Sequence, residues 1–399
     1  MNAVRSPYRR APWYCHAARF EPGKDNVFTD CDNDSHDARR KKMASGVSNI
    51  EDRKYSGKEN PTLEPSIDIH VKELVELVRK YAAPTSSART STPMDLAKKI
   101  PFFTLDVISH VGLGEPFGNL KANEDLKDYL KSSEEGLKIA NTAFAMGIAW
   151  LREIPIIGPA ISPSEKDASG FGRMMAEARK IIEMRKSKSI EGKSDMLASF
   201  TRNGVSGEDL FQETFAEIDG AVRSGTATTG VVSDAQARGV PYLVAVVREA
   251  LRVHPPVVNI FSRITPNEGD TVTIDEREYH IPGGTLIGYA AWTMHRDNRS
   301  IYGDDSHVFR PERWLIDESI QEEKERLTRM TRTNDMIFGY GRWRCLGRNI
   351  ALIEIHKCIF ELLRNFDLAL TNPHQPWHVF NSMGLWEIRD MWVDVTERS

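Results

Sequence analysis

The stretch Phe338-Gly-Tyr-Gly-Arg-Trp-Arg-Cys-Leu-Gly347 is the most informative segment of the 399-residue chain. Its three glycines allow the backbone to turn tightly and to come close to a flat ligand. Cys345 stands at the end of this loop, just before a predicted long helix, and the amides at a helix N-terminus favour a thiolate. The amides of the loop could also hydrogen-bond the sulfur and tune a bound metal. Arg342 and Arg344 flank the cysteine and could pair with anionic groups, so the segment predicts a ligand site around Cys345.

Three other interpretations of this cysteine find less support. A buried structural cysteine describes Cys358 better, because Cys358 lies beside the apolar stripe of its predicted helix. A zinc site would need a CxxC pair or a spaced set of histidines and cysteines, and the sequence offers neither. A dinucleotide-binding loop would need the spacing GxGxxG, which occurs neither here nor at residues 112–118.

The composition of the chain excludes several protein classes. It is 40% hydrophobic and 28% charged, which argues against a mostly disordered, collagen-like or coiled-coil protein. The net charge of −4 shows no signature of nucleic-acid binding, so we expect no nucleic acid among the partners. Four cysteines, at positions 15, 31, 345 and 358, are too few for a disulfide framework and fit a reducing compartment.

The chain shows no sequence signal for membrane insertion or secretion. The N-terminus lacks the apolar region of a signal peptide, and no apolar run reaches the roughly 18 residues of a transmembrane helix. The nearest stretch, residues 142–161, is interrupted by charges and prolines and predicts a buried helix followed by a loop. Residues 1–24 predict a poorly defined N-terminal lead-in.

Apolar periodicity predicts a mainly helical chain with a smaller β portion towards the C-terminal side. Pro101 predicts a kink or a restart within one of the helices. Helices are predicted over residues 36–43, 66–81, 95–112, 123–143, 169–184, 207–229, 241–253 and 347–366. Strands are predicted over residues 257–264, 272–274, 279–281 and 285–290, with further short β segments at the C-terminus.

A second motif lies on the predicted helix 241–253. Glu249 and Arg252 form the pattern ExxR, in which residues at i and i+3 share a face and can pair. The helix is otherwise apolar, so the pair is expected to be partly buried and to need further hydrogen-bond partners. Arg313, in the segment Phe309-Arg-Pro-Glu-Arg-Trp314, could supply one.

The order ExxR, FRPERW and FGYGRWRCLG resembles the haem-thiolate monooxygenases of the cytochrome P450 superfamily, most of all fungal microsomal members. The resemblance covers roughly residues 25–399 and implies one domain over residues 1–399, with the mainly α cytochrome P450-like fold and its smaller β portion. It makes Cys345 the axial thiolate ligand of the iron of haem b. It makes Glu249, Arg252 and Arg313 a structural triad that steadies the haem loop.

The same resemblance suggests further cofactor-binding positions. His36 and Arg40 match a helix that binds the haem propionates, and Arg263 matches a propionate-binding arginine. Trp343 stands where the family usually has another such arginine, so Arg342 or Arg344 could reach the propionates instead, or the tryptophan could pack on the haem. The remaining cofactor-binding positions of the loop are Phe338, Gly341 and Gly347.

The resemblance also places an oxygen-activating helix at residues 211–229. There Gly225 takes the position at which the helix widens for O2, and Thr228 takes the position of the threonine that hydrogen-bonds the bound oxygen. The family's acid is replaced by Ala227, which predicts slow or uncoupled turnover. Only 24 residues separate Gly225 from Glu249, and the family's N-terminal anchor and first helices are not found, so both regions are interpreted as missing segments.

The family resemblance implies a haem-dependent monooxygenase that inserts one atom of O2 into an apolar small molecule, in fungal secondary metabolism. Its electron donor would be an NADPH-dependent cytochrome reductase. The basic run Arg39–Lys42 would either contact this reductase or form an ordinary solvent-exposed face of its helix. Two alternatives remain: an inactive or haem-deficient truncated paralogue, and a reductase-independent haem-thiolate enzyme such as an isomerase or a peroxide-using enzyme. The family implies the endoplasmic reticulum membrane, and the lack of an anchor in the sequence leaves the cytoplasm as the alternative.

Overall fold

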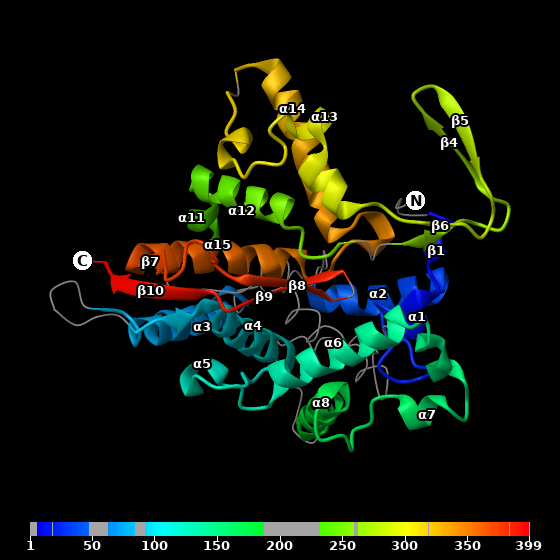
Figure 1. Cartoon of the computed structure of the whole chain (residues 1–399), viewed down its shortest axis with the longest axis horizontal. Helices are drawn as coiled ribbons and strands as arrows, with labels where there is room; N and C mark the ends of the chain where they lie inside the picture. Colours follow the sequence, from blue (N-terminus) through cyan, green and yellow to red (C-terminus); the bar gives the residue numbers. More distant parts are fainter. Residues whose placement is uncertain are drawn as a thin grey trace.

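The computed structural model describes residues 6–17, 19–47, 63–83, 92–186, 232–258, 262–317, 319–382 and 384–398. This part of the chain is mainly helical with small sheets, which confirms the fold class expected from the sequence (Figure 1). The α-helices described up to residue 186 are α1 (Trp13–Ala17), α2 (Asn33–Val47), α3 (Leu63–Arg79), α4 (Leu96–Leu113), α5 (Asn119–Ala122), α6 (Tyr129–Ala145), α7 (Gly158–Ile161) and α8 (Gly170–Lys186). The α-helices described from residue 232 onward are α11 (Asp234–Arg238), α12 (Pro241–Val253), α13 (Arg299–Tyr302), α14 (Gln321–Asp335) and α15 (Arg348–Asn365).

The described strands form small antiparallel sheets that tie distant parts of the chain together. One sheet has the order β1-β3-β6, another β2-β10-β7, and the pairs β4-β5 and β8-β9 form two hairpins. The sheet β2-β10-β7 joins the segment before α4 to the last described strand. The strands are β1 (Arg9–Arg10), β2 (Met94–Asp95), β3 (Arg263–Ile264), β4 (Asp270–Ile274), β5 (Arg277–Ile281), β6 (Leu286–Ile287), β7 (Phe366–Leu370), β8 (His378–Ser382), β9 (Leu385–Arg389) and β10 (Trp392–Glu397).

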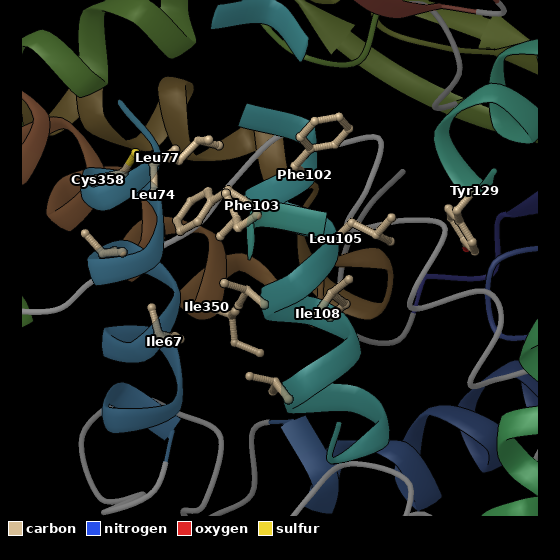
Figure 2. Close-up of a cluster of buried hydrophobic side chains, with 14 of the residues drawn as sticks. Ile67, Leu74, Leu77, Phe102, Phe103, Leu105, Ile108, Tyr129, Ile350 and Cys358 are labelled. Atoms are coloured by element: carbon tan, nitrogen blue, oxygen red, sulfur yellow. The ribbon is translucent and has the colours of Figure 1, made fainter. Parts of the chain in front are cut away.

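The largest hydrophobic core lies between α3, α4 and α15 (Figure 2). Ile67, Leu74 and Leu77 follow helical spacing on α3 and are almost completely buried against α4. Ile350 and Cys358 come into the same cluster from α15, near the other end of the chain. The core therefore holds α15 firmly, and with it the loop that precedes it.

One ion cluster fastens α15 to α3. Lys357 is completely buried, and its ammonium group contacts the carboxylates of Glu64 and Asp68, the latter at 3.0 Å. A buried lysine without such partners would be costly, so the two acids on α3 make its position possible.

Most predicted helices are found with shifted ends. The helix predicted over residues 241–253 coincides with α12, and α4 runs through Pro101 as one continuous helix. The helix predicted from residue 123 begins only at Tyr129, because Asn123 and Asp128 have φ values of 58° and 51°, which α-helical residues do not adopt. α14 was not predicted from the sequence because its residues are mostly charged or polar.

Two other expectations are corrected. Residues 142–161 were expected to form a buried helix and a loop, yet Met146, Trp150 and Ile156 are 65%, 53% and 88% exposed on the turns after α6. Within the lead-in expected at residues 1–24, β1 pairs with β3, and Tyr8 and Tyr14 are buried. The predicted helix 207–229, with Gly225, Ala227 and Thr228, lies outside the described residues.

Candidate functional site

The Cys345 loop is closed by its own backbone. Its two short 3₁₀ turns, Met336–Phe338 and Gly341–Trp343, are connected through Gly339, whose φ is +70°. A Cβ atom on Gly339 would lie 2.7 Å from the carbonyl oxygen of Trp343, so only glycine fits this turn. The Cys345 amide donates a hydrogen bond to the carbonyl oxygen of Phe338 at 2.7 Å, which closes the loop.

Cys345 lies three residues before the first residue of α15 and is exposed. The helix begins directly after Gly347, and a Cβ atom on that glycine would lie 3.9 Å from the Cys345 Sγ. The positive end of the helix dipole therefore lies close to the sulfur and favours its thiolate form. An exposed thiol at this position is accessible to a ligand outside the loop.

Trp343 is the centre of a buried cationic cluster beside this loop. The residue is only 7% exposed, and the guanidinium carbons of Arg10 and Arg263 lie 4.5 and 4.8 Å from its ring centroid. The His36 ring centroid lies 4.3 Å from the same ring. Arg342 comes close from the neighbouring position, with Nη2 3.3 Å from Asp37. We call Arg10, His36, Arg263, Arg342 and Trp343 the cationic cluster.

Many polar atoms of the cationic cluster are buried without a hydrogen-bond partner in the described part of the chain. They are Arg10 Nε, Arg263 Nε, Arg342 Nε and Nη1, Trp343 Nε1 and His36 Nε2. A folded protein rarely leaves buried polar groups unpaired, because each costs about 1–3 kcal/mol. Several such atoms in one place, most of them on cations, fit the binding of an anionic ligand with several acceptor oxygens.

The charge of the cluster is visible in the pKa of His36. Burial and the nearby guanidinium groups of Arg10, Arg40, Arg342 and Arg263 lower the pKa of His36 to about 2. Burial likewise lowers the pKa of Arg10 to about 10. Positive charge thus exceeds negative charge here, and an anion would stabilise the site.

The structure brings together most of the cofactor-binding residues named from the sequence. His36, Arg263 and Arg342 belong to the cationic cluster, and Arg40 contributes charge to it. Arg344 is exposed, and the described contacts of the cluster come from Arg342. One member, Arg10, was not predicted from the sequence, and neither was Tyr14 beside the cluster. Arg10 enters through strand pairing, because β1 places it opposite Arg263. Tyr14 comes from α1, and its hydroxyl accepts a hydrogen bond from Arg263 Nη1 at 3.3 Å.

Glu249, Arg252 and Arg313 also meet, in a second buried cluster on α12. Arg252 donates from Nε and Nη2 to the two Glu249 oxygens at 2.9 and 2.8 Å, and Arg313 Nε donates to Oε1 at 2.9 Å. The Arg310 amide and Trp314 Nε1 donate to the same carboxylate at 2.8 and 2.9 Å. Burial works to raise the pKa of Glu249, but the hydrogen bonds from Arg252 and Arg310 and the Arg252 charge hold that pKa below its ordinary value.

The two arginines of this cluster also bind backbone carbonyl groups of the segment 295–308. Arg252 Nη1 donates to the carbonyl oxygens of His295 and Ser306 at 2.8 and 2.5 Å. Arg313 Nη1 donates to the Tyr302 carbonyl at 2.6 Å. Two further hydrogen bonds lead from this region to the Cys345 loop: Asn334 Nδ2 donates to the Arg248 carbonyl at 3.2 Å, and the Tyr289 hydroxyl donates to the Met336 carbonyl at 2.9 Å.

Comparisons with known proteins identify a family and a fold to which the chain is similar. The cytochrome P450 family model matches residues 205–389. The chain is 31% identical over 440 residues to cytochrome P450 monooxygenase ABA1 of Pyricularia oryzae, covering 100% of this chain and 80% of that protein. It is 30% identical over 436 residues to cytochrome P450 monooxygenase aba1 of Botryotinia fuckeliana, with the same coverage. Among solved structures, the cytochrome P450DA heme domain matches with a TM-score of 0.73 and 15% identity, over 99% of this chain and 85% of that one.

Proposed function

The chain belongs to the cytochrome P450 family, and from that premise we propose that it binds haem b between the Cys345 loop and the cationic cluster and acts as a monooxygenase on an apolar small molecule. In this proposal Cys345 would supply the thiolate that ligates the haem iron. The cationic cluster, with Arg40 beside it, holds the haem propionates. Phe338, Gly341 and Gly347 would shape the loop that receives the haem.

The observation that carries the proposal is the set of polar atoms around Trp343 that have no hydrogen-bond partner among the described residues. Haem b brings two carboxylates on one edge of a flat aromatic ring, and the cationic cluster offers guanidinium donors together with an indole face. Cys345 lies two residues from Trp343 on the same loop, so one ligand could reach both groups. Trp343 then replaces the expected propionate-binding arginine by holding Arg10 and Arg263 in place.

A thiolate-ligated haem supplies the oxidising chemistry, because the thiolate pushes electron density to the iron and favours O–O cleavage. The residues of this chain would position the haem and tune its iron. Gly339 and the Cys345–Phe338 hydrogen bond fix the direction of the sulfur. Glu249, Arg252 and Arg313 hold the segments that lead into the loop, which makes them positioning residues.

We propose that Thr228 and Gly225 would serve oxygen activation once haem is bound, and the replacement of the family's acid by Ala227 predicts slow or uncoupled turnover. The match to ABA1 extends over 440 residues, more than the 399 residues of this chain, which supports a missing internal segment. Transcript sequencing across residues 229–233 tests this. An uninterrupted coding match to the present sequence would refute a splicing error.

We further propose an apolar product of fungal secondary metabolism as the substrate class, supported by the fungal monooxygenases that the chain resembles. The proposed electron donor is an NADPH-dependent reductase that meets the exposed Lys41 and Lys42. None of the described helices is both long and apolar enough to cross a membrane. The proposed place of action is the endoplasmic reticulum membrane by family, with the cytoplasm as the alternative.

The decisive experiment is the carbon monoxide spectrum of the reduced protein. We expect the strongly red-shifted Soret band of thiolate-ligated haem, and we expect Cys345→Ala to abolish it. Cys358→Ala is the matched control, since Cys358 is buried in the core on α15 and should leave the band in place. Failure of the unchanged protein to take up haem would contradict the proposal and favour an inactive paralogue.

A second measurement separates the reductase-dependent enzyme from a reductase-independent one. Ala227 in place of the acid makes the comparison worthwhile. Product formation with NADPH and reductase would support the monooxygenase. Product formation with peroxide alone would favour the reductase-independent alternative. In the first case Ala227→Asp should raise the product formed per NADPH consumed, and unchanged coupling would refute the role given to this position.

A further inference from the structure

Cys15 and Cys31 lie together away from the Cys345 loop. Cys15 is on α1 and Cys31 lies two residues before α2, and their Sγ atoms are 3.2 Å apart. The sulfur atoms of a disulfide are about 2.05 Å apart, so a movement of little more than about 1 Å would bring them to bonding distance. Both side chains are half-buried and therefore within reach of a small oxidant.

The chain between the two cysteines is held in this shape by its own contacts. Arg19 donates to both carboxylate oxygens of Asp25 at 2.8 and 2.6 Å. The Asn26 side chain accepts hydrogen bonds from the amides of Phe28 and Thr29 at 2.8 and 3.1 Å. The two thiols are thus preorganised, and the loop between them need not be reordered for them to react.

The two thiols differ in acidity in the way that a reactive pair requires. The hydrogen bond from Cys31 and the charge of Arg19 outweigh burial and lower the pKa of Cys15 to about 7, whereas that hydrogen bond and burial raise the pKa of Cys31. Near neutral pH a substantial part of Cys15 is therefore thiolate, whereas Cys31 stays a thiol. Cys358 is a useful contrast, because burial raises its pKa to about 12 and keeps it unreactive.

We propose that Cys15 and Cys31 form a dithiol site that hydrogen peroxide, or a related hydroperoxide, oxidises to an intramolecular disulfide. The Cys15 thiolate attacks one peroxide oxygen, the O–O bond breaks, and the sulfur becomes a sulfenic acid. The other oxygen leaves and is protonated, to water from hydrogen peroxide or to an alcohol from an organic hydroperoxide. Cys31 then attacks the Cys15 sulfur, and the S–O bond breaks with release of water. The two thiols lose two electrons and the peroxide gains them.

This site does not depend on the proposed function, because it involves neither haem nor Cys345. A cross-link there would tie α1 to the segment that leads into α2. α1 contributes Tyr14 and α2 contributes His36 to the region of the cationic cluster. The state of the dithiol would therefore set how firmly these two elements are held together.

The test is a disulfide map of the full chain after treatment with dilute hydrogen peroxide, followed by alkylation under denaturing conditions and tryptic digestion. We expect the peptides Ala11–Arg19 and Asp25–Arg39 to appear joined, lighter by two hydrogens than their sum, and to separate on reduction. Cross-linking should slow about tenfold between pH 8 and pH 6, following the thiolate fraction. Alkylation of both cysteines after peroxide, or their oxidation to sulfinic acids without a link, would overturn the proposal.

Two variants assign the roles of the partners. Cys31→Ser should accumulate a sulfenic acid at Cys15 that dimedone traps, while Cys15→Ser should leave Cys31 unlabelled by dimedone. Labelling of Cys31 in the second variant would refute the assignment of Cys15 as the attacking thiolate. The map of the unchanged chain remains decisive even if either variant folds poorly.

Discussion

Replacing Glu249 by glutamine tests whether the buried cluster on α12 is held together by charge balance. The Glu249 carboxylate faces two guanidinium groups and accepts five hydrogen bonds, from Arg252 (two), Arg313, Trp314 and the Arg310 amide. Glutamine removes the negative charge and replaces one acceptor oxygen by an amino group. The three donors at Oε1 or the two at Oε2 then lose their acceptor, depending on how the amide is turned.

The expected cost follows from these contacts. Each buried donor left unpaired costs about 1–3 kcal/mol, so two or three of them cost several kcal/mol. Breaking a buried ion pair by removing one partner costs about 3–5 kcal/mol. We therefore expect Glu249→Gln to lower the free energy of unfolding by about 3–5 kcal/mol. Because the urea dependence is about 3 kcal/mol per molar or steeper for a chain of this size, the midpoint should fall by on the order of 1 M.

The assay is urea unfolding followed by far-ultraviolet circular dichroism. Glu312→Gln is the matched control, because Glu312 lies in the same turn, Pro311–Trp314, but is exposed and contacts only the Tyr242 hydroxyl among the hydrogen bonds described for its side chain. This control should leave the midpoint unchanged. Equal midpoints for the two variants would refute the charge-balance reasoning. A lower haem content of Glu249→Gln in the folded range would support its positioning role for the Cys345 loop.

Three further predictions concern the loop, the cationic cluster and the turn after α4. Gly339→Ala should lower the free energy of unfolding more than Gly23→Ala does. Both positions have left-handed φ values, +70° and +73°, but only at Gly339 would a Cβ atom meet backbone, 2.7 Å from the Trp343 carbonyl oxygen. We expect a loss of about 1–2 kcal/mol for Gly23→Ala and a larger fall in the urea midpoint, with haem loss, for Gly339→Ala, and equal effects would contradict the steric argument. In the haem-free protein, His36 should lower the free energy of unfolding by about 2 kcal/mol between pH 7 and pH 5, because its pKa is about 2 in the folded chain and 6.5 ordinarily, so only the unfolded chain takes up the proton. The urea midpoint should therefore depend less on pH in His36→Gln, and an unchanged pH dependence would refute this assignment. Asp106→Ala should lower the free energy of unfolding by about 3 kcal/mol, because its buried carboxylate accepts hydrogen bonds from the amides of Gly118, Asn119 and Leu120 at 2.8, 3.0 and 2.9 Å. An unchanged urea midpoint would mean that these amides find other acceptors.

The parts of the site that local sequence patterns carry could be predicted. α12 is found where its apolar spacing and the following prolines place it, and Glu249 and Arg252 share its inner face as their i, i+3 spacing requires. The Cys345 loop follows from its glycines, of which Gly339 and Gly341 have left-handed φ values. The assigned roles of these residues stay predictions until haem binding is measured.

The parts that long-range contacts create could not be predicted. Arg10 reaches the site through a pairing of two-residue strands, β1 and β3, which leaves no periodic pattern in the sequence. The environment of Trp343 depends on side chains from three distant segments, so the sequence alone left open whether Arg342, Arg344 or the tryptophan would take the arginine's place. Cys15 and Cys31 were counted only as evidence against a disulfide framework, although the turn at Asn26 brings them together.

The sharing of one core by α3, α4 and α15 also sets the order of events during synthesis. Leu74 leaves the ribosome long before Ile350, and at about 5–20 residues per second the interval is on the order of tens of seconds. Throughout that interval the apolar stripe of α3 has no α15 to pack against, and Glu64 and Asp68 have no Lys357. The nascent chain therefore presents the part of the α3 face that later packs on α15, an apolar surface of the kind that chaperones bind. A message cut short before Arg348 would yield a product in which that part of the face has no α15 to cover it.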